Sequence, residues 1–318
     1  MTDLKEYSAE KITVLEGLDA VRKKFDIVEL TKRAKKRGDS LILSKELKIK
    51  YSSLRHAVEE CRILSFFPNV HKSKVNALSR LKTNRELKKF ADLYAINNLQ
   101  VRQLYKLVKK WNKDIQKNPF LFISEDEHDL IMGSLLGDAS IRQRDRNCCF
   151  RVAHSLKQKE YINWKLDKLK LFNISEFVER KKIINNRELN IIELSTKTHP
   201  VFNYYRNLFY KEDRKIIRNE MLEQLNPFSL AIWICDDGSY ETKQGYIILC
   251  TNAFSLEEHN SMKKFFNSKF GLDPTIGFRD NKYYYLRFKQ NDSKKLIEIV
   301  KPFIPPSMIY KIGEKNNG

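Results

Sequence analysis

The chain contains two apolar runs of the same form, each ending in an aspartate that is followed at once by a small residue. Residues 131–139 read IMGSLLGDA and residues 230–238 read LAIWICDDG, which places Asp138 and Asp237 99 residues apart. Continuous apolar runs of this kind are typical of buried segments, and we interpret both as helices. The recurrence predicts two equivalent helices that each end in a carboxylate.

The pattern after each aspartate is repeated as well. A β-rich stretch is followed by a helix with apolar residues at helical spacing, and then by a stretch that alternates or runs apolar like a half-buried strand. Each copy closes with an aromatic-rich helix and a lysine, Lys215 or Lys311. The order of helix, strands, helix, strands and helix therefore occurs twice, which predicts an internal duplication of α+β class. In the first and second copy, the β-rich stretches are residues 149–152 and 246–250, and the helices are residues 161–171 and 256–270. The half-buried strands are residues 189–194 and 283–288.

These segments resemble the LAGLIDADG homing endonucleases of the single-chain type, which hold both motifs in one polypeptide. Residues 135–142 (LLGDASIR) and 227–239 (PFSLAIWICDDGS) are similar to the two signature blocks, and residues 301–311 (KPFIPPSMIYK) are similar to the closing block. The resemblance covers roughly residues 125–312. It implies a pseudo-twofold duplicated αββαββα fold with two antiparallel sheets, whose halves we place at 119–222 and 223–318.

Small residues lie where the two motif helices would meet. Two helices that bring carboxylates close together need small side chains at their contact, so that the backbones can approach. Gly133, Ser134 and Gly137 in the first helix, and Ala231 in the second, meet this need. We therefore expect these four residues at the helix-pair interface.

The two aspartates form a candidate metal site. Carboxylates that converge on one point repel each other, and a divalent cation relieves this repulsion. Oxygen ligands without a nearby set of His or Cys favour Mg²⁺ over Zn²⁺. Such ions suit phosphodiester hydrolysis, because they activate water and stabilise both the attacking and the leaving oxygen. The candidate metal-site residues are Asp138, Asp237 and the residues that flank them, Gly137, Ala139 and Asp236.

Asp236 has no acidic counterpart, because Gly137 occupies that position in the first copy. It could contribute to the metal site, or it could be a local cap or a salt-bridge acid. The resemblance implies that Lys215 and Lys311 place a cation near each scissile phosphate, although a terminal lysine can equally be solvated. Arg214 is the neighbouring candidate if the register differs by one.

The charge of the chain favours a polyanionic partner. There are 60 Lys and Arg against 40 Asp and Glu, a formal charge of +20. Residues 1–120 hold 28 basic and 14 acidic residues, a net charge of +14, and residues 121–318 hold 32 and 26, a net charge of +6. This excess supports nucleic acid as the partner. By itself it could equally indicate a ribosomal or membrane-surface protein.

The lack of a recognisable targeting signal and the pattern of cysteines favour an intracellular protein. No 18-residue apolar span occurs, and the first residues do not form a signal peptide. The five cysteines show no metal-ligand spacing, which favours reduced thiols. We expect no membrane association and no secretion. The protein would be cytoplasmic in a prokaryote, or organellar if it is intron-encoded.

Residues 1–118 read as a separate, basic and mostly helical DNA-binding extension. Apolar residues recur at helical spacing over 86–108 and break at 94–97, with Asn98 as a candidate N-cap of a second helix. This spacing resembles a helix-turn-helix, and residues 44–58 hold a weaker copy of it. A plain solvated helix bundle remains the alternative. The predicted DNA contacts on the second helix are Gln100, Arg102, Gln103 and Lys106.

Basic residues at polar strand positions supply the predicted DNA-reading surface of the duplicated part. Arginine can bond guanine bidentately, and both basic side chains can contact phosphates. Each could also be a solvated charge. Residues 112–120 read as the linker that precedes this part. The predicted contacts are Arg142, Arg144, Arg146, Arg151, Arg180, Lys182, Lys243, Arg279, Lys282, Arg287 and Lys289.

The resemblance implies a monomeric, site-specific, double-strand DNA endonuclease with a long, nearly asymmetric target and short 3′ overhangs. It implies Mg²⁺ as cofactor, with Mn²⁺ as a substitute and Ca²⁺ binding without cleavage. It also implies a mobile element, in which the gene lies within an intron or stands free. An RNA maturase and a non-cleaving transcription regulator are the alternatives on the same fold. Two retained carboxylates disfavour the regulator, and a helix-turn-helix favours duplex DNA over RNA, whose deep major groove does not admit a helix.

Overall fold

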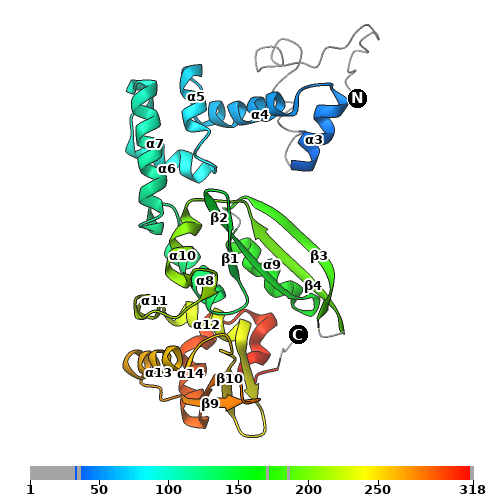
Figure 1. Ribbon diagram of the computed structural model, residues 1–318, viewed down its shortest axis with the longest axis vertical. Helices are drawn as coiled ribbons and strands as arrows, with labels where there is room; N and C mark the ends of the chain where they lie inside the picture. The colour runs from blue at the N-terminus through cyan, green and yellow to red at the C-terminus, as the bar shows by residue number, and fades with distance from the viewer. Residues whose placement is uncertain (1–32, 34–36, 170–171, 185–186, 316–318) are drawn as a thin grey trace. The chain divides into compact units, whose positions relative to one another are not determined.

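The computed structural model describes residue 33 and residues 37–169, 172–184 and 187–315 (Figure 1). The chain divides into two compact units, residues 1–110 and 111–318. This division falls inside a helix, and the predicted boundary at residue 118 lies eight residues after it. Each unit is described below by itself.

The described part of the first unit is helical. The capping box of Thr83 and Glu86 starts helix α6 (Asn84–Leu93): the Thr83 side chain accepts from the Glu86 amide, and the Glu86 carboxylate accepts from the Thr83 amide. The chain breaks after this helix, as the sequence predicts. The elements are α3 (Arg37–Glu46), α4 (Tyr51–Phe66), α5 (Lys72–Leu78), α6 (Asn84–Leu93), the 3₁₀ turn η1 (Ile96–Asn98) and α7 (Val101–Ile115).

The predicted linker over 112–120 is wrong in its first part, because α7 continues to Ile115. Leu104, Val108, Trp111 and Ile115 are all buried, and their spacing of three to four residues continues the apolar face of the helix past residue 110. A 3₁₀ turn, η2 (Pro119–Leu121), follows.

The second unit contains the same series of elements twice, which confirms the duplicated αββαββα fold (Figure 1). Each series runs helix, two strands, helix, two strands and helix. The first is α8 (Glu125–Leu136), β1 (Ser140–Arg144), β2 (Asn147–Ser155), η3 (Leu156–Gln158), α9 (Lys159–Lys168), β3 (Ile174–Ile184), β4 (Arg187–Thr196) and α10 (Val201–Phe209). The second is α12 (Pro227–Asp237), β7 (Gly238–Glu241), β8 (Tyr246–Leu249), α13 (Leu256–Phe270), β9 (Thr275–Arg279), β10 (Tyr283–Phe288) and α14 (Gln290–Val300).

Short elements close each series and carry the two lysines singled out above. After the first series come β5 (Tyr210–Lys211), β6 (Arg214–Lys215) and α11 (Asn219–Glu223). After the second come the 3₁₀ turns η4 (Lys301–Phe303) and η5 (Pro306–Ile312). Lys215 thus ends a hairpin and Lys311 lies in a 3₁₀ turn, so the closing segments differ in form between the halves.

Each half has one four-stranded antiparallel sheet, with strand order β1-β2-β4-β3 in the first and β7-β8-β10-β9 in the second. Helices α9 and α10 contact the first sheet, and α13 and α14 contact the second. The strand positions that face these helices are apolar and buried, such as Phe150 and Val152 in β2 and Ile247 and Leu249 in β8. Because strand side chains alternate, the intervening positions form an opposite face that the helices leave uncovered.

Helices α8 and α12 contact each other and hold the motif aspartates at their ends. Capping boxes start both helices, Ser124 with Glu127 in α8 and Asn226 with Ser229 in α12. Nearly all residues of both helices are buried. Residues 130–136 of α8 and 228–236 of α12 are buried on every side of their helices, as the apolar runs predict. Among the described helices, none combines the length and the apolar character that a membrane crossing requires.

Candidate active site and DNA-binding surface

The contact between α8 and α12 is too close for side chains at two positions. A Cβ added at Gly133 would lie 2.2 Å from the carbonyl oxygen of Ser229 and 2.7 Å from the Cβ of Ile232. A Cβ at Gly137 would lie 2.4 Å from the Cβ of Asp236. Glycine is required at both positions because the backbone of one helix touches the other. Ser134 and Ala231, the other two predicted interface residues, are fully buried.

Asp138 follows the end of α8 and is the more exposed of the two motif aspartates. Its side chain is 41% exposed, and its Oδ2 lies 3.2 Å from Nδ1 of His154 on β2. Partial burial would raise the pKa of Asp138, but hydrogen bonding and charge from His154, and the charges of Lys165 and Lys311, lower it below its ordinary value. This carboxylate is therefore held in its ionised form.

Asp237, the last residue of α12, has a different environment. It lines a hollow of about 430 Å³ together with Tyr240, Tyr310 and Lys311. Burial and the neighbouring carboxylates, Asp138 first, raise its pKa to about 8, although Lys215 and Lys311 oppose the shift. The negative charge of Asp138 is thus one cause of the raised pKa of Asp237.

Lys215 and Lys311 make equivalent contacts at the ends of the two motif helices. Nζ of Lys215 donates to the carbonyl of Gly137 at 3.0 Å, and Nζ of Lys311 donates to the carbonyls of Asp236 at 3.3 Å and Gly238 at 2.9 Å. Gly137 and Asp236 precede the motif aspartates, so each lysine binds the same position of its own half. Positive charge at this point complements the negative end of a helix dipole.

Burial lowers the pKa of Lys215 to about 8, although the carboxylates of Asp237, Asp236 and Asp138 oppose the shift. Both lysines therefore lie within the electrostatic field of the aspartates. Arg214, the alternative to Lys215, instead pairs with Glu258 away from this point.

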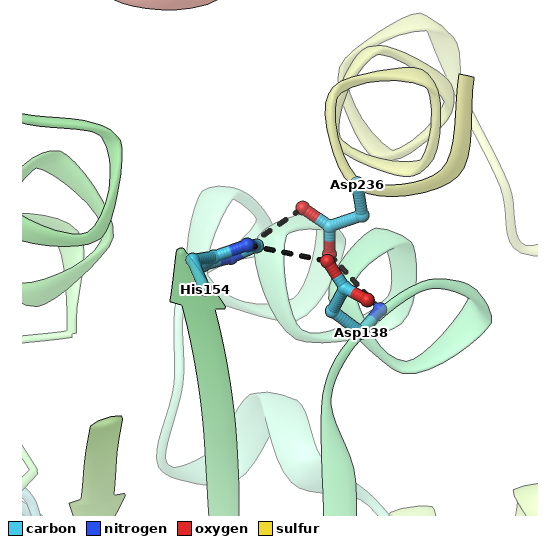
Figure 2. A group of neighbouring side chains, drawn as sticks. All are labelled: Asp138, His154 and Asp236. Atoms are coloured by element: carbon cyan, nitrogen blue, oxygen red, sulfur yellow. Dashed lines mark hydrogen bonds and ion pairs between the residues drawn. The ribbon is translucent and has the colours of Figure 1, made fainter. Parts of the chain in front are cut away.

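Asp236 is the centre of a buried network that joins the two halves. Its Oδ1 lies 2.7 Å from Nζ of Lys165 and accepts from the hydroxyl of Tyr161 at 2.8 Å, and its Oδ2 lies 2.9 Å from the same Nζ. Oδ2 also accepts from the amide of Asp138 at 3.3 Å. Nε2 of His154 lies 3.8 Å from Oδ1 (Figure 2). The side chains of Asp236 and Lys165 are both fully buried.

The sequence patterns did not single out Lys165, Tyr161 or His154. Tyr161, Ile162 and Lys165 share the buried face of α9, so that Lys165 is a single charge on an otherwise apolar face. Such a lysine, together with an unmatched Asp236, is a signal of a buried ion pair. His154 lies at the end of a strand and carried no comparable signal.

These groups could hold a divalent cation. Ligand atoms of Asp138, His154 and Asp236 all lie within 4.8 Å of one another (Figure 2). The ring nitrogens of buried His154 face the two carboxylates, Nδ1 at 3.2 Å from Asp138 and Nε2 at 3.8 Å from Asp236. Asp237 is not one of these three residues, and the oxygens of Asp236 already face Lys165 and Tyr161. The oxygen donors fit Mg²⁺ or Mn²⁺.

The open face of the first sheet is rich in arginine. Pairing of Arg151 with Ser195 and of Arg142 with Cys149 puts these side chains on the face away from α9 and α10. The same register puts Arg144 and Arg180 on that face. Arg151 forms an ion pair with Glu193, whereas Arg142 and Arg144 are exposed. Arg146 is exposed in the turn after β1, and the side chain of Lys182 lies outside what the structure describes.

The open face of the second sheet combines arginine with tyrosine. The guanidinium of Arg287 lies 4.2 Å from the ring centre of Tyr246, and that of Arg279 lies 6.0 Å from the ring centre of Tyr285. The ring of Tyr285 covers Gly277, its cross-strand partner, where a Cβ would lie 2.2 Å from the ring. The predicted lysines of this half are exposed outside the strands. They are Lys243, Lys282 and Lys289.

In the first unit, the four predicted contact residues lie at the start of α7. Arg102, Gln103 and Lys106 are exposed, as is Gln100 before the helix. The side chain of Gln103 accepts from the backbone amide of Gln100 at 2.8 Å and so caps its own helix. Two of the four residues are thereby engaged in starting α7.

Comparisons with known proteins agree with this architecture. The sequence model of the LAGLIDADG DNA endonuclease family matches residues 128–296, just over half of the 318 residues. The solved structure of the homing endonuclease I-WcaI bound to its DNA recognition sequence has a TM-score of 0.55 and 24% identity, covering 71% of this chain and 97% of that one. At this identity the likeness concerns the fold.

Three curated relatives carry different names. The probable intron-encoded endonuclease 1 of Wickerhamomyces canadensis is 28% identical over 65% of this chain and 90% of its own length. The cytochrome b mRNA maturase bI2 of Debaryomyces hansenii is 30% identical over 58% and 72%. The protein RecA of Mycolicibacterium chitae is 28% identical over 60% and 47%, so the chain spans about half the length of that relative.

Proposed function

Because the chain belongs to the LAGLIDADG DNA endonuclease family, we propose that it is a site-specific endonuclease that cuts both strands of duplex DNA. The observation that carries the proposal is the glycine-mediated contact between two helices whose C-terminal ends carry Asp138 and Asp237. Each aspartate has a lysine of its own half beside it, Lys215 or Lys311. A centre duplicated in this way offers one set of groups to each DNA strand.

Asp138 and Asp237 would hold the divalent cations, with main-chain oxygens of the flanking Gly137 and Ala139 as further candidates. Bound there, such an ion would acidify a water and neutralise charge on the phosphate oxygens. The raised pKa of Asp237 supports this role, because the repulsion that raises it is relieved by a cation between the carboxylates. Mg²⁺ fits the oxygen donors, Mn²⁺ would substitute, and Ca²⁺ would support binding without cleavage.

The other groups of the site would stabilise negative charge on the phosphates and position the carboxylates. With a pKa of about 8, Lys215 carries its proton on Nζ at neutral pH and would add positive charge beside one scissile phosphate, as Lys311 would beside the other. His154 would orient the Asp138 carboxylate, which lies 3.2 Å away. Asp236 would act through its contacts with Lys165 and the Asp138 amide rather than as a ligand.

The open faces of the two sheets would lie along the DNA. Arg142 and Arg144 are candidates for base and phosphate contacts in the first half, and Arg279 and Arg287 in the second. Because these faces differ, we propose a long and nearly asymmetric target. Arg102 and Lys106 on α7 would add phosphate contacts. We further propose short 3′ overhangs, a monomer, and an intracellular location.

A cleavage-site selection tests this proposal. The full chain is incubated with a randomised duplex library in Mg²⁺, and the ends of both strands are sequenced. We expect one family of targets, cut at one position on each strand with a short 3′ overhang. The same library in Ca²⁺ is the matched control, and it should be bound but not cut. Failure to cut in Mg²⁺ and in Mn²⁺ would contradict the proposal.

RNA maturation is the second candidate, because one relative at 30% identity is named a cytochrome b mRNA maturase. The sheet faces could serve folded RNA as well as duplex DNA. A splicing reaction with intron-containing RNA, run beside the cleavage selection, distinguishes the two. Splicing without DNA cleavage would assign the maturase role to this chain. A transcription regulator would bind the duplex in Mg²⁺ without cutting it.

A further inference from the structure

The helix pair α3–α4 has a tighter connection than the pair α6–α7. Four residues, 47–50, join α3 to α4, whereas seven residues, 94–100, join α6 to α7 and contain η1. A turn of three to four residues between two crossing helices defines the DNA-binding helix-turn-helix. Only the first connection has this length, although the sequence pattern favoured the second pair.

The turn after α3 has a defined geometry. Lys48 has a positive φ of 50°, and the amide of Ile49 donates to the carbonyl of Ser44 at 2.9 Å. This arrangement ends the helix with a left-handed residue and satisfies a terminal carbonyl. Ile49 is then buried at 3% exposure and fixes the turn against the unit's core. The chain can therefore enter α4 at once in a new direction (Figure 1).

The two faces of α4 are distinct. Leu54, Ala57 and Ile63 are buried against the rest of the unit. On the other side Ser52 and Arg55 are exposed, one turn apart, near the start of the helix. In a helix-turn-helix, the first residues of the second helix are those that reach base edges.

Basic charge surrounds the start of α4. Lys45 and Lys48 are exposed on the turn side, and the exposed acid there, Glu46, forms an ion pair with Arg33 at 3.2 Å. Farther along α4, Arg62 is paired with Glu59. Within residues 45–66, the exposed positive charge therefore lies at the turn and the first part of α4, where a polyanion could approach.

The start of α7, in contrast, is engaged in holding the unit together. Nζ of Lys74 donates to the carbonyls of Ile96 and Asn97 in the connection before α7, at 3.1 and 2.7 Å. The guanidinium of Arg80 lies 4.8 Å from the ring centre of Tyr105 on α7. These contacts cover part of the surface that a recognition helix would have to place in a groove.

We infer that α4 is the helix that enters the major groove of duplex DNA, with Ser52 and Arg55 at base edges and Lys48 on a phosphate. The inference rests on the DNA endonuclease function proposed above and assigns a second, separate reading element to the same target. Arg55 would bond guanine bidentately. A-form RNA does not admit a helix in its major groove, which favours duplex DNA as the partner.

Binding of the full chain to a duplex library in Ca²⁺, with the region beside the cleaved segment randomised, tests this assignment. Arg55→Ala should weaken binding by on the order of tenfold and abolish a base preference outside the cleaved segment. Arg55→Lys keeps the charge but not the bidentate fork, so it should lose the preference with a smaller loss of affinity. Lys48→Ala should weaken binding to all sequences and lower the log–log salt slope by about 0.9.

Arg102→Ala on α7 is the matched control, because it removes an exposed arginine from the other helix pair. Because a phosphate contact is proposed for Arg102, this variant should weaken binding to all sequences alike and leave the base preference unchanged. Loss of that preference in Arg102→Ala but not in the two Arg55 variants would overturn the assignment, as would tighter binding of an RNA duplex than of the DNA duplex. Absence of cleavage in Mg²⁺ with an Arg55-dependent preference intact would contradict the proposed nuclease and leave the α4 assignment supported.

Discussion

The two halves place an aspartate at the same position but give it opposite electrostatic surroundings. Asp138 lies 3.2 Å from His154 and has a lowered pKa, whereas the pKa of Asp237 is raised to about 8. By the register of the two hairpins, Thr251 is the counterpart of His154, and its hydroxyl lies 2.7 Å from a ring nitrogen of His259. The duplication has therefore preserved the backbone of the site but not its charges.

Burial of Asp237 and the contact of His154 with Asp138 are the main causes of the difference, and a buried ion pair with one residue from each half adds to it. Asp236 has Gly137 as its counterpart, and Lys165, the seventh residue of α9, has Met262 as the seventh residue of α13. The two unmatched residues meet across the halves, with both side chains fully buried. Asp236 raises the pKa of Asp237, and Lys165 lowers that of Asp138.

Removing Lys165 should have the largest effect on stability. Lys165→Met copies the residue of the second half, but it leaves the Asp236 carboxylate buried without its cation, at a cost of about 3–5 kcal/mol in the free energy of unfolding. The measurement is urea unfolding of the full chain. Asn163→Ala, on the exposed side of the same helix, is the control and should cost about 0.5 kcal/mol or less.

A double-mutant cycle sharpens the same point. Asp236→Ala should also destabilise, because it leaves Lys165 uncompensated. The combined variant Lys165→Met with Asp236→Ala should cost less than the sum of the two single changes, by about 1–3 kcal/mol. Simple additivity would mean that the pair does not couple the halves.

The two motif aspartates should respond oppositely to the same substitution in metal-free buffer. At pH 8 in EDTA, Asp237→Asn should raise the melting temperature, because it removes a repelled carboxyl, and Asp138→Asn should lower it. Each kcal/mol corresponds to about 2–4 °C for a unit of this size. The check is a thermal unfolding scan of wild type and both variants. Shifts of equal sign would contradict the electrostatic difference between the halves.

The pH dependence of these shifts follows from the two pKa directions. Asp237 ionises near 3.8 when unfolded and near 8 when folded, so its penalty is absent below about pH 4 and grows as pH rises to about 8. The gain from Asp237→Asn should therefore vanish in acid. The pKa of Asp138 is lower in the folded state than the ordinary 3.8, so ionised Asp138 stabilises the fold fully above pH 3.8. This stabilisation is lost as the pH falls from 3.8 through the lower, folded-state pKa.

Substitutions on the open faces of the two sheets should have smaller effects, which are measured as changes in the salt dependence of DNA binding. Arg142→Ala with Arg144→Ala removes two exposed guanidiniums, and it should lower the log–log slope in Ca²⁺ by about 1.8 if both contact phosphates. Tyr285→Ala in the second sheet removes packing over Gly277 without removing charge, so affinity should fall while the slope stays unchanged. Equal changes of slope would mean that the two faces bind DNA alike.

The sequence predicts the duplicated part well because its patterns are local and occur twice. The bounds of α13 and β10 agree with the predicted 256–270 and 283–288, and β2 is longer than predicted by a few residues at each end. Glycines mark the helix contact because only they permit backbone approach. The end of α7 was missed because Asn112 and Lys113 resemble a linker, although buried Trp111 and Ile115 continue the helix.

The network beneath the site could not be predicted in the same way. Lys165, Tyr161 and Asp236 lie on helices of different halves, 71 and 75 residues apart, and only the fold brings them together. Local periodicity gives the buried position of Lys165 but not its partner. The motif therefore reveals which residues repeat, whereas the residues that differ between the copies determine how the two aspartates behave.

The most direct test of the paired site is cleavage of a selected target with both strands labelled. Neither Asp138→Asn nor Asp237→Asn should make a double-strand break in Mg²⁺, while both should bind the same duplex in Ca²⁺ as wild type does. Glu125→Gln, at the far end of α8, is the control and should cut normally. Double-strand cleavage at the wild-type rate by either Asn variant would contradict the claim that both halves supply a catalytic carboxylate.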